Sequence, residues 1–220
     1  MPTTTDRLFS AADREAIRRA ATEAETRTSG EIVPFVVNRC DGYEEASWKL
    51  AALAAMAAAA VAGAIHVEGG FWGGLGVLWM TLPVVAAGVL GYLAALFWPA
   101  LRRRLVPPEV LEQRVHQRAM QAFLEEEVFA TRDRTGVLLF LSLFEHRVVV
   151  LGDAGINAQV EPGDWAGITA RLAVGIRRGR AAAALVEAIA EVGALLEEKQ
   201  VEIRPDDIDE LSDELRIRNE

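Results

Sequence analysis

Three aspartates lie beside the apolar segments of this sequence, and they are the residues best suited to chemistry. Asp41 follows one such segment, Asp133 precedes a second, and Asp153 follows a third. Carboxylate oxygens in loops are the ligands that hard cations such as Ca²⁺ and Mg²⁺ take in proteins. If the strands run parallel, we expect Asp41 and Asp133 to approach the same end of a sheet. The three residues together are therefore a candidate metal site.

Two other interpretations of these carboxylates remain open. Asp153 is followed by Gly155 and preceded by Gly152, a pattern typical of a turn aspartate that caps the next helix. Asp41 and Glu44 could equally belong to a solvated loop close to lipid headgroups. The sequence has no P-loop, no G-x-S-x-G, no H-E-x-x-H and no dinucleotide-binding glycine pattern. We therefore predict no catalytic residue.

The composition limits the function classes. The 220 residues carry a formal net charge of −9, which argues against a general nucleic-acid-binding surface. The hydrophobic fraction is 51%, and the mean hydropathy of +0.17 favours a soluble domain with a small membrane part. Cys40 is the only cysteine, which excludes an intrachain disulfide and an all-cysteine metal site. The polar N-terminal segment predicts no cleavable signal peptide.

A long, nearly uncharged tract divides the chain, in which residues 50–65 and 69–101 carry no charged side chain. A membrane helix needs about 20 mainly apolar residues, so this region can hold two spans, at roughly 48–67 and 74–100, with a turn near His66 to Gly70. Trp48, Trp72 and Trp98 lie near the expected ends of the spans, where indole rings favour the interface. An alanine-rich soluble helix followed by one true span is the alternative. We also expect Pro83 to kink the second span.

The basic residues predict the topology of the two spans. Arg39 and Lys49 precede the first span, Arg102, Arg103 and Arg104 follow the second, and the turn between them carries no Lys or Arg. By the positive-inside rule both flanks and both termini are cytoplasmic, and the protein is a two-pass protein of the inner (cytoplasmic) membrane. Strands on either side of the tract can then meet in one sheet.

The elements that must position the carboxylates alternate between helix and strand. Ser10 and Asp13 form a capping-box pattern that begins a helix, Gly30 ends it, and the strand EIVPFVV follows, with Pro34 indicating an edge or irregular position. After the membrane tract comes a helix that restarts at Pro107 and Pro108. A strand hairpin and two helices around Gly179 then follow. The expected fold is α/β, a small mixed sheet sandwiched by helices with an inserted transmembrane hairpin. We expect residues 1–47 and 105–200 to form the α/β domain and residues 48–104 to form the hairpin. Residues 201–220 are an acidic tail, which we expect to be disordered in part or loosely docked.

These segments resemble the TPM-domain family, in its bacterial membrane-anchored branch. The motifs that carry the resemblance are RTSGEIVPFVV and DRTGVLLFLSLFEHRVVVLGDAGI, and they cover most of the chain outside the hairpin and tail. The resemblance implies a small α/β sandwich tethered at a membrane. It also implies Ca²⁺ as a cofactor at loops along one sheet edge, and a plant thylakoid relative is described as an acid phosphatase. Here Arg134 and Thr135 stand where calcium-binding members carry an acidic D-N-G motif, which argues against Ca²⁺.

Two hypotheses about function follow from these observations. The first is a membrane-anchored cytoplasmic module that binds a protein partner or organises a membrane complex, with the lipid bilayer as its other partner and no nucleic acid. The alternative is a metal-dependent phosphatase acting on phosphomonoesters, which would use Asp41, Asp133 and Asp153 as metal ligands. The first rests on the two-span hairpin and on the missing catalytic motifs, and the second on the three carboxylates near the strand ends.

Overall fold

The structure is a computed structural model that describes residues 9–69, 77–199, 201 and 210–218. The chain divides into two compact units. Residues 1–41 and 112–220 form the first, which we call the α/β domain, and residues 42–111 form the second, which we call the hairpin unit. The hairpin unit is therefore an insertion in the α/β domain.

A four-stranded mixed sheet forms the centre of the α/β domain. Its strands are β1 (Glu31–Val37), β2 (Gly136–Ser142), β3 (Arg147–Gly152) and β4 (Arg216–Arg218), in the spatial order β3-β2-β1-β4. β1 pairs in parallel with both β2 and β4, whereas β3 pairs antiparallel with β2 as the second arm of a hairpin. The predicted mixed α/β fold and the β2–β3 hairpin are confirmed.

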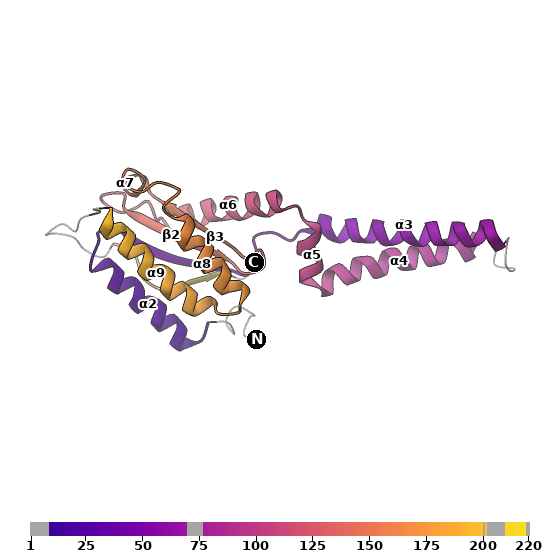
Figure 1. Cartoon of the computed structure of the whole chain (residues 1–220), viewed down its shortest axis with the longest axis horizontal. Helices are drawn as coiled ribbons and strands as arrows, with labels where there is room; N and C mark the ends of the chain where they lie inside the picture. Colours follow the sequence, from indigo (N-terminus) through magenta and orange to yellow (C-terminus); the bar gives the residue numbers. More distant parts are fainter. Residues whose placement is uncertain (1–8, 70–76, 200, 202–209, 219–220) are drawn as a thin grey trace. The chain divides into compact units, whose positions relative to one another are not determined.

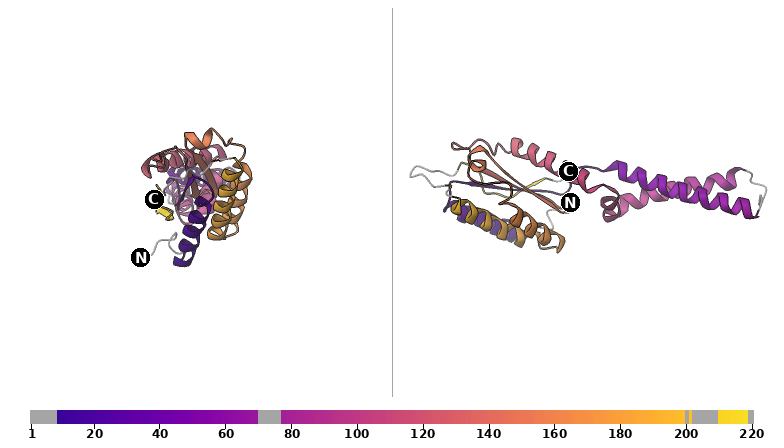
Figure 2. Two further views of the ribbon diagram at one scale, coloured as in Figure 1. Left: turned by 90° about the vertical axis from the view of Figure 1, so that its left-hand side faces the viewer. Right: turned by 45° about the horizontal axis from the view of Figure 1, so that its top comes forward.

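Helices cover both faces of this sheet (Figures 1 and 2). α2 (Ala11–Glu25), α8 (Ala166–Arg177) and α9 (Ala181–Glu198) lie on one face, and α6 (Pro108–Glu125) lies on the other. Alternate side chains of one strand point to opposite faces, so β1 supplies Ile32 and Val36 to the first core and Val33 and Phe35 to the second. Every residue of β1 and β2 is buried, which explains their almost continuous apolar sequence.

The acidic tail is not merely a loose appendage, because its described part supplies β4 and docks on the sheet. Glu126 forms ion pairs with Arg216 and Arg218, each at 3.1 Å. The Glu31 carboxylate accepts the backbone N–H groups of Glu210 and Leu211 at 3.3 and 3.4 Å. The edge position that Pro34 indicated is wrong, because β1 lies between β2 and β4. Proline is nevertheless tolerated there, because β4 pairs with β1 only from Phe35 onward and offers no acceptor beside Pro34.

The hairpin unit consists of α3 (Glu44–Gly69), α4 (Val77–Phe97) and the short α5 (Pro99–Leu105). α3 and α4 lie side by side (Figure 1). Both pass the length and composition requirements of a membrane span, over Glu44–Glu68 and Leu78–Phe97. α4 continues through Pro83 and ends at Phe97, three residues before the predicted end of the second span, because Trp98 and Pro99 begin a new helix. Trp72 lies outside the described residues.

Small residues let α3 and α4 approach closely. A methyl group added at Gly91 would lie 2.9 Å from both the Leu50 carbonyl oxygen and the Ala54 Cβ, whereas one added at Gly63 would meet nothing within 4 Å. Close contact of this kind is typical of helix packing in membranes. The outer surface of the pair is apolar and exposed; Val67 and Phe97, for example, are 84% and 76% exposed.

Candidate functional site

The three candidate metal ligands do not converge. Asp41 follows the carboxyl end of β1, whereas Asp133 precedes the amino end of β2, and in two parallel strands these are opposite ends of the sheet. Asp153 follows β3, which runs antiparallel to β2, and it therefore lies at the same end as Asp133. The expected approach of Asp41 to Asp133 is wrong, because parallel pairing places them at opposite ends.

The carboxylate of Asp153 is already engaged by other groups of the protein. Its Oδ1 accepts the Ala154 N–H at 2.7 Å and caps α7 (Ala154–Asn157). The Arg134 guanidinium donates a hydrogen bond from Nη2 to Oδ1 at 2.9 Å. Its Nε lies 2.6 Å from Oδ2 and forms an ion pair with it. This second contact is not an aligned hydrogen bond, because Oδ2 accepts none from the described residues. Asp153 thus caps the helix that follows it, as in the first of the two other interpretations of the carboxylates.

These residues do not fit Ca²⁺. A guanidinium stands where a hard cation would need an oxygen ligand. Arg134 holds this position with a backbone φ of +59°, in the left-handed region. Over the residues that the structure describes, no group of three or more His, Cys, Asp or Glu side chains could hold a metal ion.

At the other end of the sheet, Asp41 lies 3.1 Å from Nε of Arg114 on α6. Beside it, the buried Glu145 accepts the Cys40 N–H at 2.9 Å and the Ser142 hydroxyl. These bonds fasten the loop after β1 to the β2–β3 turn. Their role is therefore structural, and Asp41 contributes to the stability of this end of the sheet.

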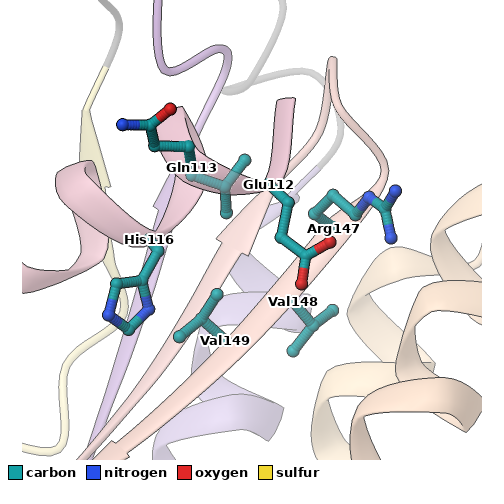
Figure 3. Close-up of a pocket in the computed structure, with 7 residues that line it drawn as sticks. Glu112, Gln113, His116, Arg147, Val148 and Val149 are labelled. Atoms are coloured by element: carbon teal, nitrogen blue, oxygen red, sulfur yellow. The ribbon is translucent and has the colours of Figure 1, made fainter. Parts of the chain in front are cut away.

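A small pocket lies between α6 and the edge strand β3 (Figure 3). Glu112 extends from α6 toward Val148 of β3, and His116 lies beside Val149, whereas the Gln113 amide points away from the strand; Arg147 completes the lining on the β3 side. The cavity measures about 210 Å³. Among the described residues, Arg147 makes no ion pair, so its charge is available to a ligand.

The backbone of β3 is open on its outer side. Because Asp153 donates its N–H to the Gly136 carbonyl, alternation along an antiparallel ladder directs the N–H and C=O groups of Arg147, Val149 and Leu151 toward β2. The groups of Val148 and Val150 then point outward. The Gly152 carbonyl also points outward, and the Asn157 side-chain amide donates to it at 2.6 Å. This bond closes one end of the edge and leaves the part around Val148 and Val150 free to pair with another strand.

The edge of β3 and its pocket form the candidate binding site. All six β3 residues are half-buried, and no strand of the described chain pairs with the outer edge of β3. Such an edge is a template for an added strand. The sequence signalled the hairpin but not this site, because the site depends on which strand lies outermost. Glu112 and His116 reach it only through the packing of α6.

A second polar cluster lies between the end of α2 and the docked tail. The Glu25 carboxylate accepts the Ile32 N–H at 2.8 Å, and Asp213 accepts a hydrogen bond from the Thr22 hydroxyl. Burial, together with the smaller effect of the neighbouring Asp213 and Glu31 carboxylates, raises the pKa of Glu25 to about 9, against the Ile32 hydrogen bond, which lowers it. Glu25 is therefore protonated at neutral pH.

Comparisons with known proteins support the fold alone. No family model and no curated protein matches this sequence. Among solved structures, the chain is similar to the NMR structure of the BA42 protein from the psychrophilic bacterium Bizionia argentinensis, with a TM-score of 0.56 and 19% sequence identity over 96% of this chain and 95% of that one.

Proposed function

We propose that the chain is a membrane-anchored, cytoplasmic, TPM-like module that binds an extended segment of a partner protein along β3. The observation that carries the binding part is the edge at Val148 and Val150, which no described strand pairs with, beside a pocket whose Arg147 makes no ion pair with any described residue. The segments that carry the family resemblance are those that build β1, β2 and β3.

The anchor is supported by the surface of the hairpin unit. Both long helices are apolar and mostly exposed, and such a surface is unfavourable in water but stable in a bilayer. The basic residues of α5 and Lys49 lie at the end of the unit where its two flanks meet, as expected for a cytoplasmic boundary.

The partner is defined by the chemistry of the edge. An extended segment would pair its backbone with the outward groups of Val148 and Val150, which supplies affinity through main-chain hydrogen bonds. A carboxylate on the segment would face Arg147, which supplies specificity. Glu112 disfavours a second acidic side chain in the same pocket.

Substitutions at the edge test this proposal in the full chain in native membranes, by cross-linking and mass spectrometry of the linked peptides. We expect links from a partner segment to map to residues 147–150. Val150→Pro removes an outward N–H without removing a bond to β2, and Arg147→Glu reverses the charge. Each should reduce these links about tenfold, equivalent to about 1.4 kcal/mol.

Arg178→Glu is the matched control, because it makes the same charge change on the exposed end of α8. It should leave the links unchanged. Thermal unfolding of each variant shows whether the fold is kept. Links that survive both edge substitutions in folded protein, or that join only two copies of this chain, would contradict the proposal.

A further inference from the structure

The hairpin unit carries a groove on its outer surface. It measures about 530 Å³ and is lined almost entirely by apolar atoms of α3 and α4. The groove exists because small side chains form its floor: Ala51, Ala52 and Ala55 on α3 face Gly88 on α4. Its volume lies within the range of about 300–1,000 Å³ that is typical of small-molecule sites.

An aromatic pair and a basic segment mark one end of this groove. The rings of Trp48 and Tyr92 lie 5.1 Å apart between centroids and line the groove, as aromatic side chains do at the level of lipid headgroups. α5 packs against α3 within the same unit, and Arg102 on α5 donates to the Gly42 carbonyl at 3.1 Å. The basic residues of α5 therefore lie at the aromatic end of the groove.

The charge at this end favours an anion. Lys49 and Arg104 are exposed, and Arg102 and Arg103 add two further positive charges, against the two carboxylates of Glu44 and Glu45 in the first turn of α3. The buried Nε of Arg102 has no acceptor among the described residues. From this end the groove runs inward from Trp48 to Ala55, seven residues of helix or about 10 Å.

We propose that the groove binds an anionic phospholipid, with an acyl chain over Gly88 and the phosphate at Lys49 and Arg104. A single ligand with a charged head and an apolar tail matches both parts of the site. A second copy of the chain matches less well, because copies inserted in the same orientation would bring their basic α5 segments to the same depth, where like charges repel. The inference rests on the proposed insertion of the hairpin unit in a membrane.

Lipid titration of the purified full chain tests this site, with native mass spectrometry in detergent as the readout. Dioleoyl phosphatidylglycerol should be retained at about tenfold lower concentration than dioleoyl phosphatidylcholine. Free glycerol phosphate, which has the headgroup charge but no acyl chain, should not compete. Equal retention of the two lipids, or full competition by glycerol phosphate, would overturn the proposal.

Variants separate the two parts of the site. Gly88→Leu fills the groove and should reduce retention of phosphatidylglycerol about tenfold, whereas Gly63→Leu, in the same hairpin but with nothing near it, should not. Lys49→Gln with Arg104→Gln should lower phosphatidylglycerol to the level of phosphatidylcholine, and this surface pair tests the site even if Gly88→Leu does not fold. Unchanged retention in folded variants, or a dimer that Gly88→Leu abolishes, would contradict lipid binding.

A carbonate wash distinguishes failure of the lipid site from failure of the membrane anchor. Membranes that contain the chain are washed with alkaline carbonate before purification. Release of the chain would contradict membrane insertion, whatever its lipid preference. Retention without a preference for phosphatidylglycerol would contradict the lipid site alone.

Discussion

Gly136→Ala is expected to unfold the α/β domain. A Cβ at this position would lie 2.0 Å from the Val128 carbonyl oxygen, 2.8 Å from its Cγ1 and 3.0 Å from its carbonyl carbon. Backbone atoms cannot move aside as a flexible side chain can. Gly136 is also the first residue of β2, where it pairs with Glu31 of β1. We expect a loss of more than about 4 kcal/mol in the free energy of unfolding, at the extreme of single substitutions.

Hydrogen exchange measures this effect in the full chain. The amides of β2 should be strongly protected in the native protein and lose their protection in Gly136→Ala. Gly163→Ala is the control, because a Cβ there meets nothing within 4 Å; its effect should stay within about 0.5 kcal/mol. Native-like protection of β2 in Gly136→Ala would show that Val128 does not pack against this strand as described.

Glu25→Gln is expected to stabilise the α/β domain at neutral and alkaline pH. The pKa of Glu25 is raised from 4.5 to about 9 by burial, so between these values the folded state binds one more proton than the unfolded state. Stability contributed by this group is then present below pH 4.5 and is lost as the pH rises toward 9. Glutamine resembles the protonated acid and keeps an oxygen for the Ile32 N–H.

The gain should be about 2 kcal/mol at pH 7, since the full shift is partly screened by solvent at this half-buried site. Pulse proteolysis in urea at pH 5, 7 and 9 measures it. The native protein should become less stable over this interval, and Glu25→Gln should show a flatter profile. Glu23→Gln, on the exposed side of α2, should keep the native profile. A parallel loss in Glu25→Gln and the native protein would mean that another group causes the pH dependence.

The parts of the fold that could be predicted are those with a strong local pattern. The buried strands β1 and β2, the hairpin to β3 and the two apolar helices each show their structure in consecutive residues. Ser10 and Asp13 form the capping box that their spacing indicated. β4 has no such pattern: three residues, Arg-Ile-Arg, form a strand only because β1 offers an edge and Glu126 pairs with both arginines.

The candidate sites depend on long-range geometry, which explains where the prediction was wrong. Asp41 and Asp133 were expected together, but a helical crossover between parallel strands leaves the end of one and the start of the next at opposite ends of the sheet. Arg134 was read as unfavourable for calcium, and its ion pair with Asp153 gives the physical reason. The pocket at β3 and the Glu25 cluster combine residues far apart in the chain, so neither could be found from spacing.

A topology measurement is the first test of the proposal that the hairpin unit spans a bilayer and holds both parts of the α/β domain on its cytoplasmic side. Single cysteines are introduced into a Cys40→Ser background by Arg19→Cys, Glu68→Cys and Ser212→Cys, all at exposed positions, and labelled with a membrane-impermeant maleimide in vesicles of known orientation. We expect the chain to resist carbonate extraction, positions 19 and 212 to be labelled from the cytoplasmic side, and position 68 to be labelled from the other. Release by carbonate, or labelling of 19 and 212 from opposite sides, would contradict it.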